Sequence, residues 1–127
     1  MIYKPHAIGK QAEQQAREFL ETKGLRYLQA NYHCSHGEID LIMQDGHMLV
    51  FIEVRSRHPS TYGNVLETIT PRKQQKIMKT ALYFLKENRL LKKPYYRFDV
   101  VGIEYKTGRI DVHWIKNAFT RENGYIP

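Results

Sequence analysis

The stretch GEIDLIMQDGHMLVFIEVRSR, which runs from Gly37 to Arg57, decides the expected fold. Its two halves, 39–43 and 48–55, alternate at the two-residue period of a β-strand. The dipeptide Asp45-Gly46 between them is typical of a two-residue turn. The segment therefore predicts a β-hairpin, although it carries acidic residues among side chains that belong in a core.

The acidic residues of this hairpin fall on one of its faces, because side chains alternate sides along a strand. A turn at Asp45-Gly46 places Asp40 opposite Phe51 and Glu38 opposite Glu53, and the second of these is an unfavourable like-charge pair. Asp40 then lies one diagonal away from Glu53, at about 7 Å between backbones. The two carboxylates can therefore reach one cation, whereas a turn of odd length would separate them.

Apolar residues cover both faces of the hairpin, as is typical of a sheet that is buried on both sides. Acidic side chains are costly there unless they are paired or bind a metal. Oxygen ligands without soft partners suit Mg²⁺ or Mn²⁺. The sequence favours a divalent metal site at Asp40 and Glu53, and an exposed face with solvated acids is the alternative.

Helices and strands are predicted on both sides of the hairpin. They are helices over 8–23 and 71–87, strands over 25–33, 97–104 and 109–115, and a last helical turn over 117–122. The second helix has a clear start, because Thr70 can cap it and Pro71 fits its first turn. The order α-β-β-β-α-β-β indicates the α/β class, with helices packed on a mixed sheet. We expect one domain over 1–127, with flexible ends at 1–6 and 123–127.

The chain is basic, with 20 Lys and Arg against 13 Asp and Glu and a net charge of +7. This balance suggests a polyanionic partner such as nucleic acid, although many small proteins are basic without one. A single cysteine excludes an internal disulfide, and no apolar run approaches the roughly 18 residues that would span a membrane. We therefore expect a cytoplasmic protein without a membrane segment.

Basic residues gather around the second predicted helix and the strand before it. They are Arg55 and Arg57 at the end of the hairpin, and Arg72, Lys73, Lys76 and Lys79 on the helix. Contacts with nucleic-acid phosphates are the functional interpretation of this pattern. A solvated helix face is the alternative.

Two acidic residues outside the hairpin also need an interpretation. Glu13 falls at the edge of the apolar arc of the first helix, about 20° beyond Leu20, so it can lean toward the predicted metal site. Asp99 alternates with core residues of a later strand. We interpret Asp99 as a structural residue that pairs with Arg97 or with a neighbouring strand.

Several segments together resemble one known family. They are GEIDLI and VFIEVRSR of the hairpin, AEQQAREFL of the first helix, YGNVLETITPRKQQKI leading into the second helix, and RFDVV of a later strand. This combination resembles the YraN family of small bacterial proteins across nearly the whole chain. That family is similar to the restriction-endonuclease-like PD-(D/E)XK nucleases, and among them to the archaeal Holliday-junction resolvases. The resemblance implies a central mixed β-sheet of four to five strands flanked by α-helices.

The resemblance also implies an active site. Its catalytic residues would be Glu13, Asp40, Glu53 and Arg55, and Mg²⁺ or Mn²⁺ would be held by Asp40, Glu53 and the main-chain carbonyl of Val54. The implied function is that of a metal-dependent endonuclease that hydrolyses phosphodiester bonds of DNA, with branched or structured DNA as one candidate substrate. Relatives that cut junctions act as dimers, so a homodimer is left open.

Position 55 departs from the implied pattern, which has a lysine there. Arg55 stays protonated at any working pH, so it cannot act as a general base, although it can bind the scissile phosphate. Lys73 of the second helix is the lysine best placed to substitute. The alternative function is a binding module of the same fold that recognises structured nucleic acid with little or no cleavage, and a protein–protein adaptor in a DNA-processing complex is a third.

Overall fold

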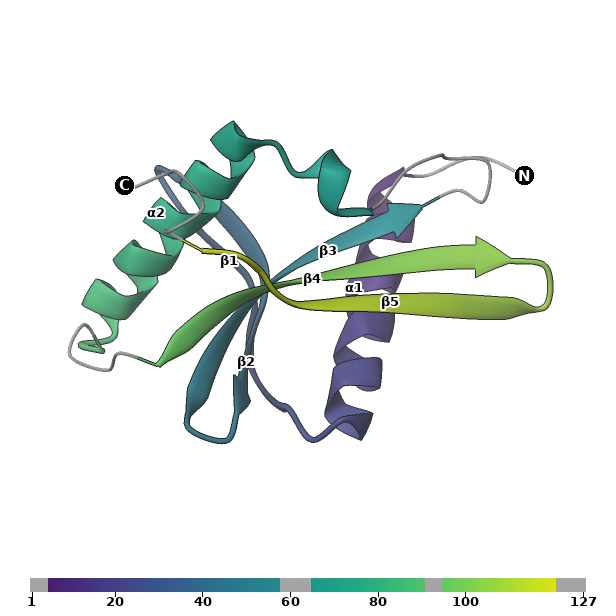
Figure 1. The fold of residues 1–127 in the computed structure, drawn as a ribbon, viewed down its shortest axis with the longest axis horizontal. Coiled ribbons are helices and arrows are strands. Elements are labelled where there is room, and N and C mark those ends of the chain that lie inside the picture. The colour runs from purple at the N-terminus through teal and green to yellow at the C-terminus, as the bar shows by residue number, and fades with distance from the viewer. Residues whose placement is uncertain (1–4, 58–64, 91–94, 121–127) are drawn as a thin grey trace.

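The helices and strands follow one another along the chain in the predicted order (Figure 1). The computed structural model describes residues 5–57, 65–90 and 95–120, apart from the side chains of 5–8 and 57. Its elements are α1 (Pro5–Thr22), β1 (Arg26–Cys34), β2 (Gly37–Asp45), β3 (Met48–Arg57), η1 (Val65–Thr68), α2 (Pro71–Glu87), β4 (Tyr96–Lys106) and β5 (Arg109–Phe119). The predicted α/β class is confirmed, while the expectation for 123–127 falls outside the described residues.

The strands form one mixed sheet of five, in the order β1-β2-β3-β4-β5. Neighbouring strands are antiparallel except β3 and β4, which run parallel from the pair Leu49–Tyr96 to the pair Arg57–Glu104. A parallel pair needs a crossover connection, and η1 and α2 lie within that connection. The predicted mixed sheet flanked by helices is therefore confirmed.

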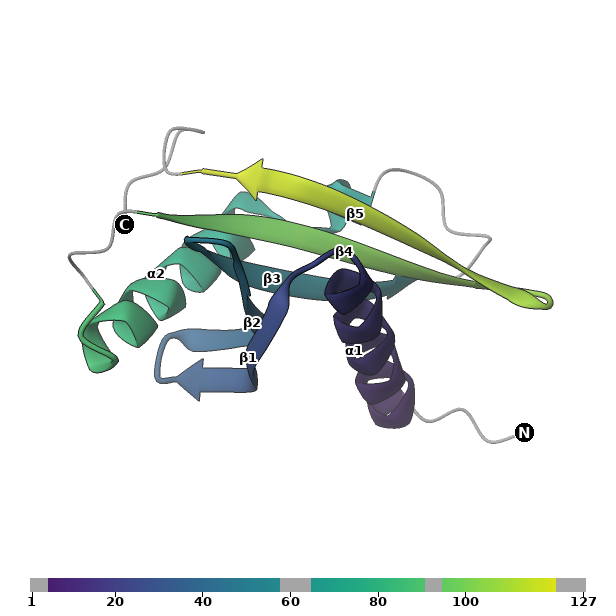
Figure 2. The same cartoon turned by 90° about the horizontal axis from the view of Figure 1, so that it is seen from below.

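The two helices pack on different buried clusters, and Figure 2 shows them on either side of the strands β1 and β2. The cluster at α1 contains Leu41, Met43, Val50, Ile52, Val101 and Ile103 from the sheet, and the cluster at α2 contains Ile42, Phe51, Phe98 and Val100. Successive residues of a strand enter different clusters, so both faces of the sheet are buried, as predicted. Among the described residues, no helix is both long and apolar enough to cross a membrane.

The start of α2 follows from the two residues that were predicted to set it. The Thr70 hydroxyl accepts a hydrogen bond from the backbone N–H of Lys73 at 3.2 Å, and Pro71 occupies the first turn. The helix then buries residues at helical spacing, namely Ile77, Met78, Thr80, Ala81, Phe84 and Leu85. Basic residues on its other sides, Arg72, Lys76 and Lys79, are exposed. The predicted basic surface is therefore present on α2.

The turn of the β2–β3 hairpin lies one residue later than predicted. Asp45 pairs with Met48, so the turn consists of Gly46 and His47 instead of Asp45-Gly46. Gly46 has a φ of 61°, in the left-handed region that glycine adopts without strain. This correction shifts the strand register by two residues, which keeps every side chain on its predicted face but changes its partner on the other strand.

The corrected register brings the predicted metal ligands closer together. Leu41 pairs with Ile52, so the next position of the hairpin puts Asp40 opposite Glu53, where a diagonal contact was predicted. The predicted like-charge pair of Glu38 with Glu53 is therefore wrong. Side chains that are directly opposite lie closer than diagonal neighbours, so this register favours a shared site more than the predicted one did.

Strand β5 continues where the sequence predicted a last helical turn. It ends at Phe119, which is buried and stacks on Phe98 with 5.1 Å between ring centroids. The pairing with β4 shifts between Phe98 and Val100, and Asn117 has a φ of 50°. The backbone N–H of Asn117 donates to Oδ1 of Asp99 at 2.9 Å. A buried carboxylate therefore holds the end of β5 in the sheet, and no local sequence pattern indicates that contact.

Asp99 lies at the centre of this buried network. It is 0% exposed, and it accepts hydrogen bonds from Arg97 Nε at 3.0 and 3.2 Å and from Trp114 Nε1 at 3.0 Å. Arg97 also pairs through Nη2 with Oδ2 of Asp45 at 3.0 Å. The network joins β4 to β5 and to the β2–β3 hairpin, so the predicted pairing of Asp99 with Arg97 is confirmed.

Candidate metal and phosphate site

The sheet twists sharply at the residue that was predicted to bind a metal. Ile39 and Leu41 lie two positions apart and would share a face in a regular strand, yet Ile39 packs in the cluster at α2 and Leu41 in the cluster at α1. On the neighbouring strand β1, Asn31 has a φ of 54°, which interrupts the regular strand conformation there. Asp40 is the residue between Ile39 and Leu41, so its side chain lies at the twist instead of within either apolar cluster.

Asp40 and Glu53 come together at this twist. The backbone N–H of Val54 donates to Oδ2 of Asp40 at 2.8 Å, so a carboxylate takes the place of a backbone carbonyl at the end of the β2–β3 ladder. Glu53 is only 8% exposed, and its carboxyl group is close enough to that of Asp40 for each to shift the pKa of the other. The structure therefore places the two predicted metal ligands side by side.

The electrostatics of this pair indicate an excess of buried negative charge. Burial and, to a smaller extent, the charge of Asp40 raise the pKa of Glu53 to about 7, although Arg55 and Lys73 partly oppose the shift. Burial also raises the pKa of Asp40, against the hydrogen bond from Val54. The pair therefore tends to retain a proton near neutral pH.

Two basic side chains approach Glu53 from different elements. Arg55 on β3 places Nη2 at 3.2 Å from Oε1 of Glu53, and Lys73 on α2 places Nζ at 3.6 Å from the same oxygen. The Nε atom of Arg55 is buried and has no hydrogen-bond partner among the described residues. The structure thus brings together four of the predicted site residues, namely Asp40, Glu53, Arg55 and Lys73.

A cavity of about 170 Å³ opens over these carboxylates. Its lining residues are Gly37, Glu38, Asp40, Glu53, Lys73, Lys76 and Ile77. The β1–β2 turn forms one wall of the cavity and lies close to α2. A Cβ atom added at Gly37 would lie only 3.2 Å from Oγ1 of Thr80. The predicted phosphate-binding residues Lys73 and Lys76 therefore share one cavity with the predicted metal ligands.

Glu13 lies outside this cavity but within electrostatic reach of it. Burial raises the pKa of its carboxyl group, and the charge of Asp40 raises it further. The Asn31 side chain, oriented so that its amide nitrogen faces Glu13, donates to the two carboxylate oxygens at 3.1 and 3.2 Å. Asn31 therefore orients Glu13 beside the site, and the sequence offered no indication of this contact.

The remaining predicted site residues are less closely connected to the cavity. Arg72 is exposed on the first turn of α2. Val54 contacts Asp40 through its N–H, and the role of its main-chain carbonyl stays a prediction. The side chain of Arg57, predicted to bind nucleic acid, lies outside the described residues.

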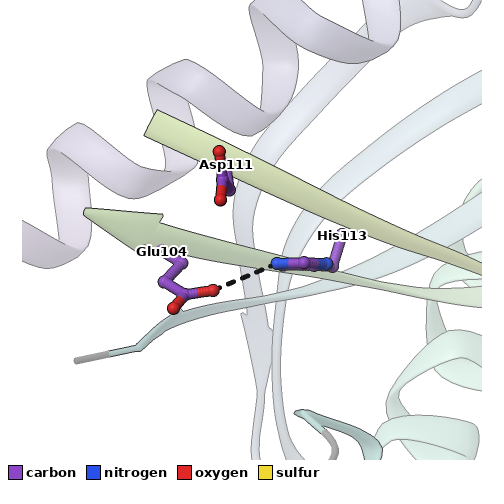
Figure 3. Close-up of side chains that lie close together, drawn as sticks. All are labelled: Glu104, Asp111 and His113. Carbon is purple, nitrogen blue, oxygen red and sulfur yellow. Dashed lines mark hydrogen bonds and ion pairs between the residues drawn. The ribbon is translucent and has the colours of Figure 1, made fainter. Parts of the chain in front are cut away.

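A second cluster of possible metal ligands, which the sequence reasoning missed, lies on the β4–β5 hairpin. Figure 3 shows its members, Glu104, Asp111 and His113, whose ligand atoms all lie within 4.8 Å of one another. Asp111 already pairs with Lys106 at 2.9 Å and with Arg109 at 3.2 Å, and the hydrogen bond from Lys106 lowers its pKa. We interpret this cluster as a surface ion-pair network, because its carboxylates already have cationic partners.

The comparisons with known proteins agree with the resemblance found in the sequence. A family model described as uncharacterised protein family UPF0102 matches residues 12–103. The chain belongs to this family. UPF0102 is the YraN family, so the predicted family membership is confirmed. The matched residues include Glu13 and the whole Asp40–Glu53 site, and they end before Glu104.

Curated relatives extend the similarity over most of the chain. A UPF0102 protein of Nitrosococcus oceani is 44% identical over 115 residues, which cover 91% of this chain and 93% of the relative. A relative from Coxiella burnetii is 47% identical over the same shares of both chains. A relative from Legionella pneumophila is 48% identical over 111 residues, or 87% of this chain and 92% of its own.

The raised pKa of Glu53 predicts how the stability of the protein depends on pH. Its pKa is about 7 in the folded state against 4.5 without the fold, so the folded state binds more protons between these values. The free energy of unfolding should therefore fall as the pH rises through this window. Glu53→Gln lacks this titration. Its free energy of unfolding, relative to that of wild type, should therefore rise by about 2–3 kcal/mol from pH 5 to pH 8, measured without divalent cations. Urea unfolding of both proteins at pH 5 and pH 8 measures this change. The same difference between variant and wild type at both pH values would contradict the raised pKa of Glu53.

Proposed function

We propose that this chain is a metal-dependent endonuclease that hydrolyses phosphodiester bonds of DNA. One observation carries the proposal: the half-buried carboxylate of Asp40 and the buried carboxylate of Glu53, from adjacent strands, lie in one cavity with Lys73 and Lys76. Buried acidic groups that repel each other are costly, and a divalent cation offsets that cost. The basic side chains around the same cavity suit an anionic substrate.

The residues of the site fit a Mg²⁺ or Mn²⁺ ion. Asp40 and Glu53 would hold it, since Mg²⁺ in phosphate chemistry uses one or two carboxylates together with water and substrate oxygens. Arg55 and Lys73 leave the pKa of Glu53 at about 7, so they compensate its burial only in part. When bound, the cation would supply Lewis-acid polarisation of the phosphate and neutralise charge that develops on it.

The chain's own basic residues would bind and orient the substrate. Lys76 is exposed at the cavity and suits a phosphate next to the scissile one. Arg55 keeps its charge at any working pH, so its role is to stabilise negative charge in the transition state. Lys73 reaches the same Glu53 oxygen from α2, and it is therefore the side chain that we assign to orienting the attacking water.

A cleavage assay tests this function directly. Supercoiled plasmid and four-way junctions are incubated with the protein and Mg²⁺ or Mn²⁺, and parallel reactions contain EDTA. We expect nicked or resolved products that depend on the divalent cation. DNA binding without any cleavage under these conditions would instead favour the alternative function, a binding module of the same fold. Arg55, at a position where the resembled nucleases have lysine, is the feature that favours this alternative.

Cation binding is also expected to be visible without DNA. At pH 8, Mn²⁺ at tenfold excess over its Kd should raise the melting temperature by about 5 °C. At pH 5.5 the effect should be small, because Glu53 holds a proton below its pKa of about 7. Asp40→Asn should remove the effect, and Asp111→Asn in the cluster on the β4–β5 hairpin should retain it. A shift that disappears with Asp111→Asn instead would assign the cation to that cluster.

A further inference from the structure

One flank of α2 continues away from the candidate metal site. Lys73, Lys76, Thr80, Tyr83 and Glu87 recur every three or four residues, so they line the same side of the helix. Lys73 and Lys76 border the cavity over the carboxylates. At the other end of the flank, a second cavity of about 220 Å³ is lined by Tyr83, Lys86 and Glu87. The two cavities therefore lie along a single helix flank.

Tyr83 presents an aromatic ring to solvent in the second cavity. It is 43% exposed although its helix packs on the core. Its ring contacts the exposed His36 of the β1–β2 turn, with 6.2 Å between ring centroids and 62° between ring planes. Lys86, also exposed, adds a positive charge beside the ring. An accessible ring next to a basic side chain is the arrangement on which nucleic-acid bases stack.

The β1–β2 turn lies against both ends of this flank. The β1–β2 turn supplies Gly37 to the first cavity and His36 to the ring of Tyr83. The turn also lies against Thr80, midway along the flank. Tyr83 lies seven positions after Lys76 along the helix, a rise of about 10 Å. This distance is within the reach of one or two nucleotides of an extended strand.

We propose that this flank of α2 binds an unpaired strand, with a phosphate at Lys76 and a base stacked on Tyr83. The faces of bases are covered by their neighbours in an intact duplex, so only an unpaired base can stack on the ring. The inference rests on the proposed function and defines its substrate class, which is DNA with a single-stranded segment beside the cleaved bond. Tyr83 is a binding residue in this account and does not touch the reacting phosphate.

Equilibrium binding of short oligonucleotides tests the inference. The affinities of the protein for a labelled single strand and for the matching duplex are measured by fluorescence anisotropy with EDTA, so that cleavage does not interfere. Tyr83→Ala should weaken single-strand binding by about tenfold and duplex binding by less than about twofold. Tyr83→Phe should retain the wild-type affinity, because stacking needs the ring and not the hydroxyl. Tyr95→Ala is the matched control, because Tyr95 is 62% exposed but belongs to neither cavity.

The salt dependence separates stacking from charge. Lys76→Ala should reduce the slope of log affinity against log salt for the single strand by about 0.7, the value for one phosphate contact. Tyr83→Ala should leave this slope unchanged, because a stacked base releases no counterions. A changed slope for Tyr83→Ala would assign its effect to altered lysine contacts and would overturn the stacking assignment.

The outcomes separate this inference from the proposed function. Equal losses for single strand and duplex, or a loss no larger than that of Tyr95→Ala, would overturn the inference even in a protein that cuts DNA. A selective loss of single-strand binding in a protein that cuts no DNA would refute the nuclease and support the same strand path in a binding module.

Discussion

Asp40→Asn is expected to lower Mg²⁺-dependent DNA cleavage by about a thousandfold, since a catalytic cation contributes several kcal/mol to the transition state. The substituted side chain keeps its size, and its carbonyl oxygen can still accept the hydrogen bond from Val54. It removes one of the two charges that would hold the cation beside Glu53. The rate of plasmid nicking measures the effect, and DNA affinity in EDTA should stay near that of wild type.

Asp111→Asn is the matched control for this experiment. Asp111 is also a partly exposed acid in a cluster whose ligand atoms could hold a cation, but its carboxylate already pairs with Lys106 and Arg109. We expect this variant to cut DNA at the wild-type rate. Cleavage that survives Asp40→Asn and disappears with Asp111→Asn would move the active site to the β4–β5 hairpin.

The hairpin at the site shows how far a sequence pattern reaches. Alternation along the strands correctly assigned Asp40 and Glu53 to one face, because a shift of two residues does not change the face of a side chain. The pattern could not define the register, because Asp45-Gly46 and Gly46-His47 both offer a glycine to the turn. The sequence therefore brought Asp40 and Glu53 together through a strand register that is wrong by two residues. The observed register places the two side chains closer to each other than the predicted one did.

Contacts between distant segments account for what the sequence did not show. Asn31 twists β1 and orients Glu13, and these two residues lie on different elements with no common motif. The pairing of Glu104 with Asp111 follows only once the register of β4 and β5 is known. Local periodicity and capping, in contrast, predicted α2 well, because Thr70 and Pro71 act on their own helix.

Asp99→Ala is expected to destabilise the protein by about 3–5 kcal/mol, because it leaves a largely buried guanidinium and other donors without their acceptor. Arg97, Trp114 Nε1 and the N–H of Asn117 all donate to this one carboxylate. Arg97 keeps Asp45 as a second partner, which limits the loss. The free energy of unfolding in urea measures the change.

The comparison with an acid on the same hairpin separates burial from charge pairing. Asp111 also pairs with an arginine, Arg109, but this pair is open to solvent, so Asp111→Ala should leave the free energy of unfolding close to that of wild type. The free energy of unfolding of Asp99→Asn should lie between those of Asp99→Ala and Asp111→Ala, because this substitution keeps the shape of the side chain and removes its charge. If Asp99→Ala unfolded like wild type but lost DNA cleavage, Asp99 would belong to the active site instead of the structural network.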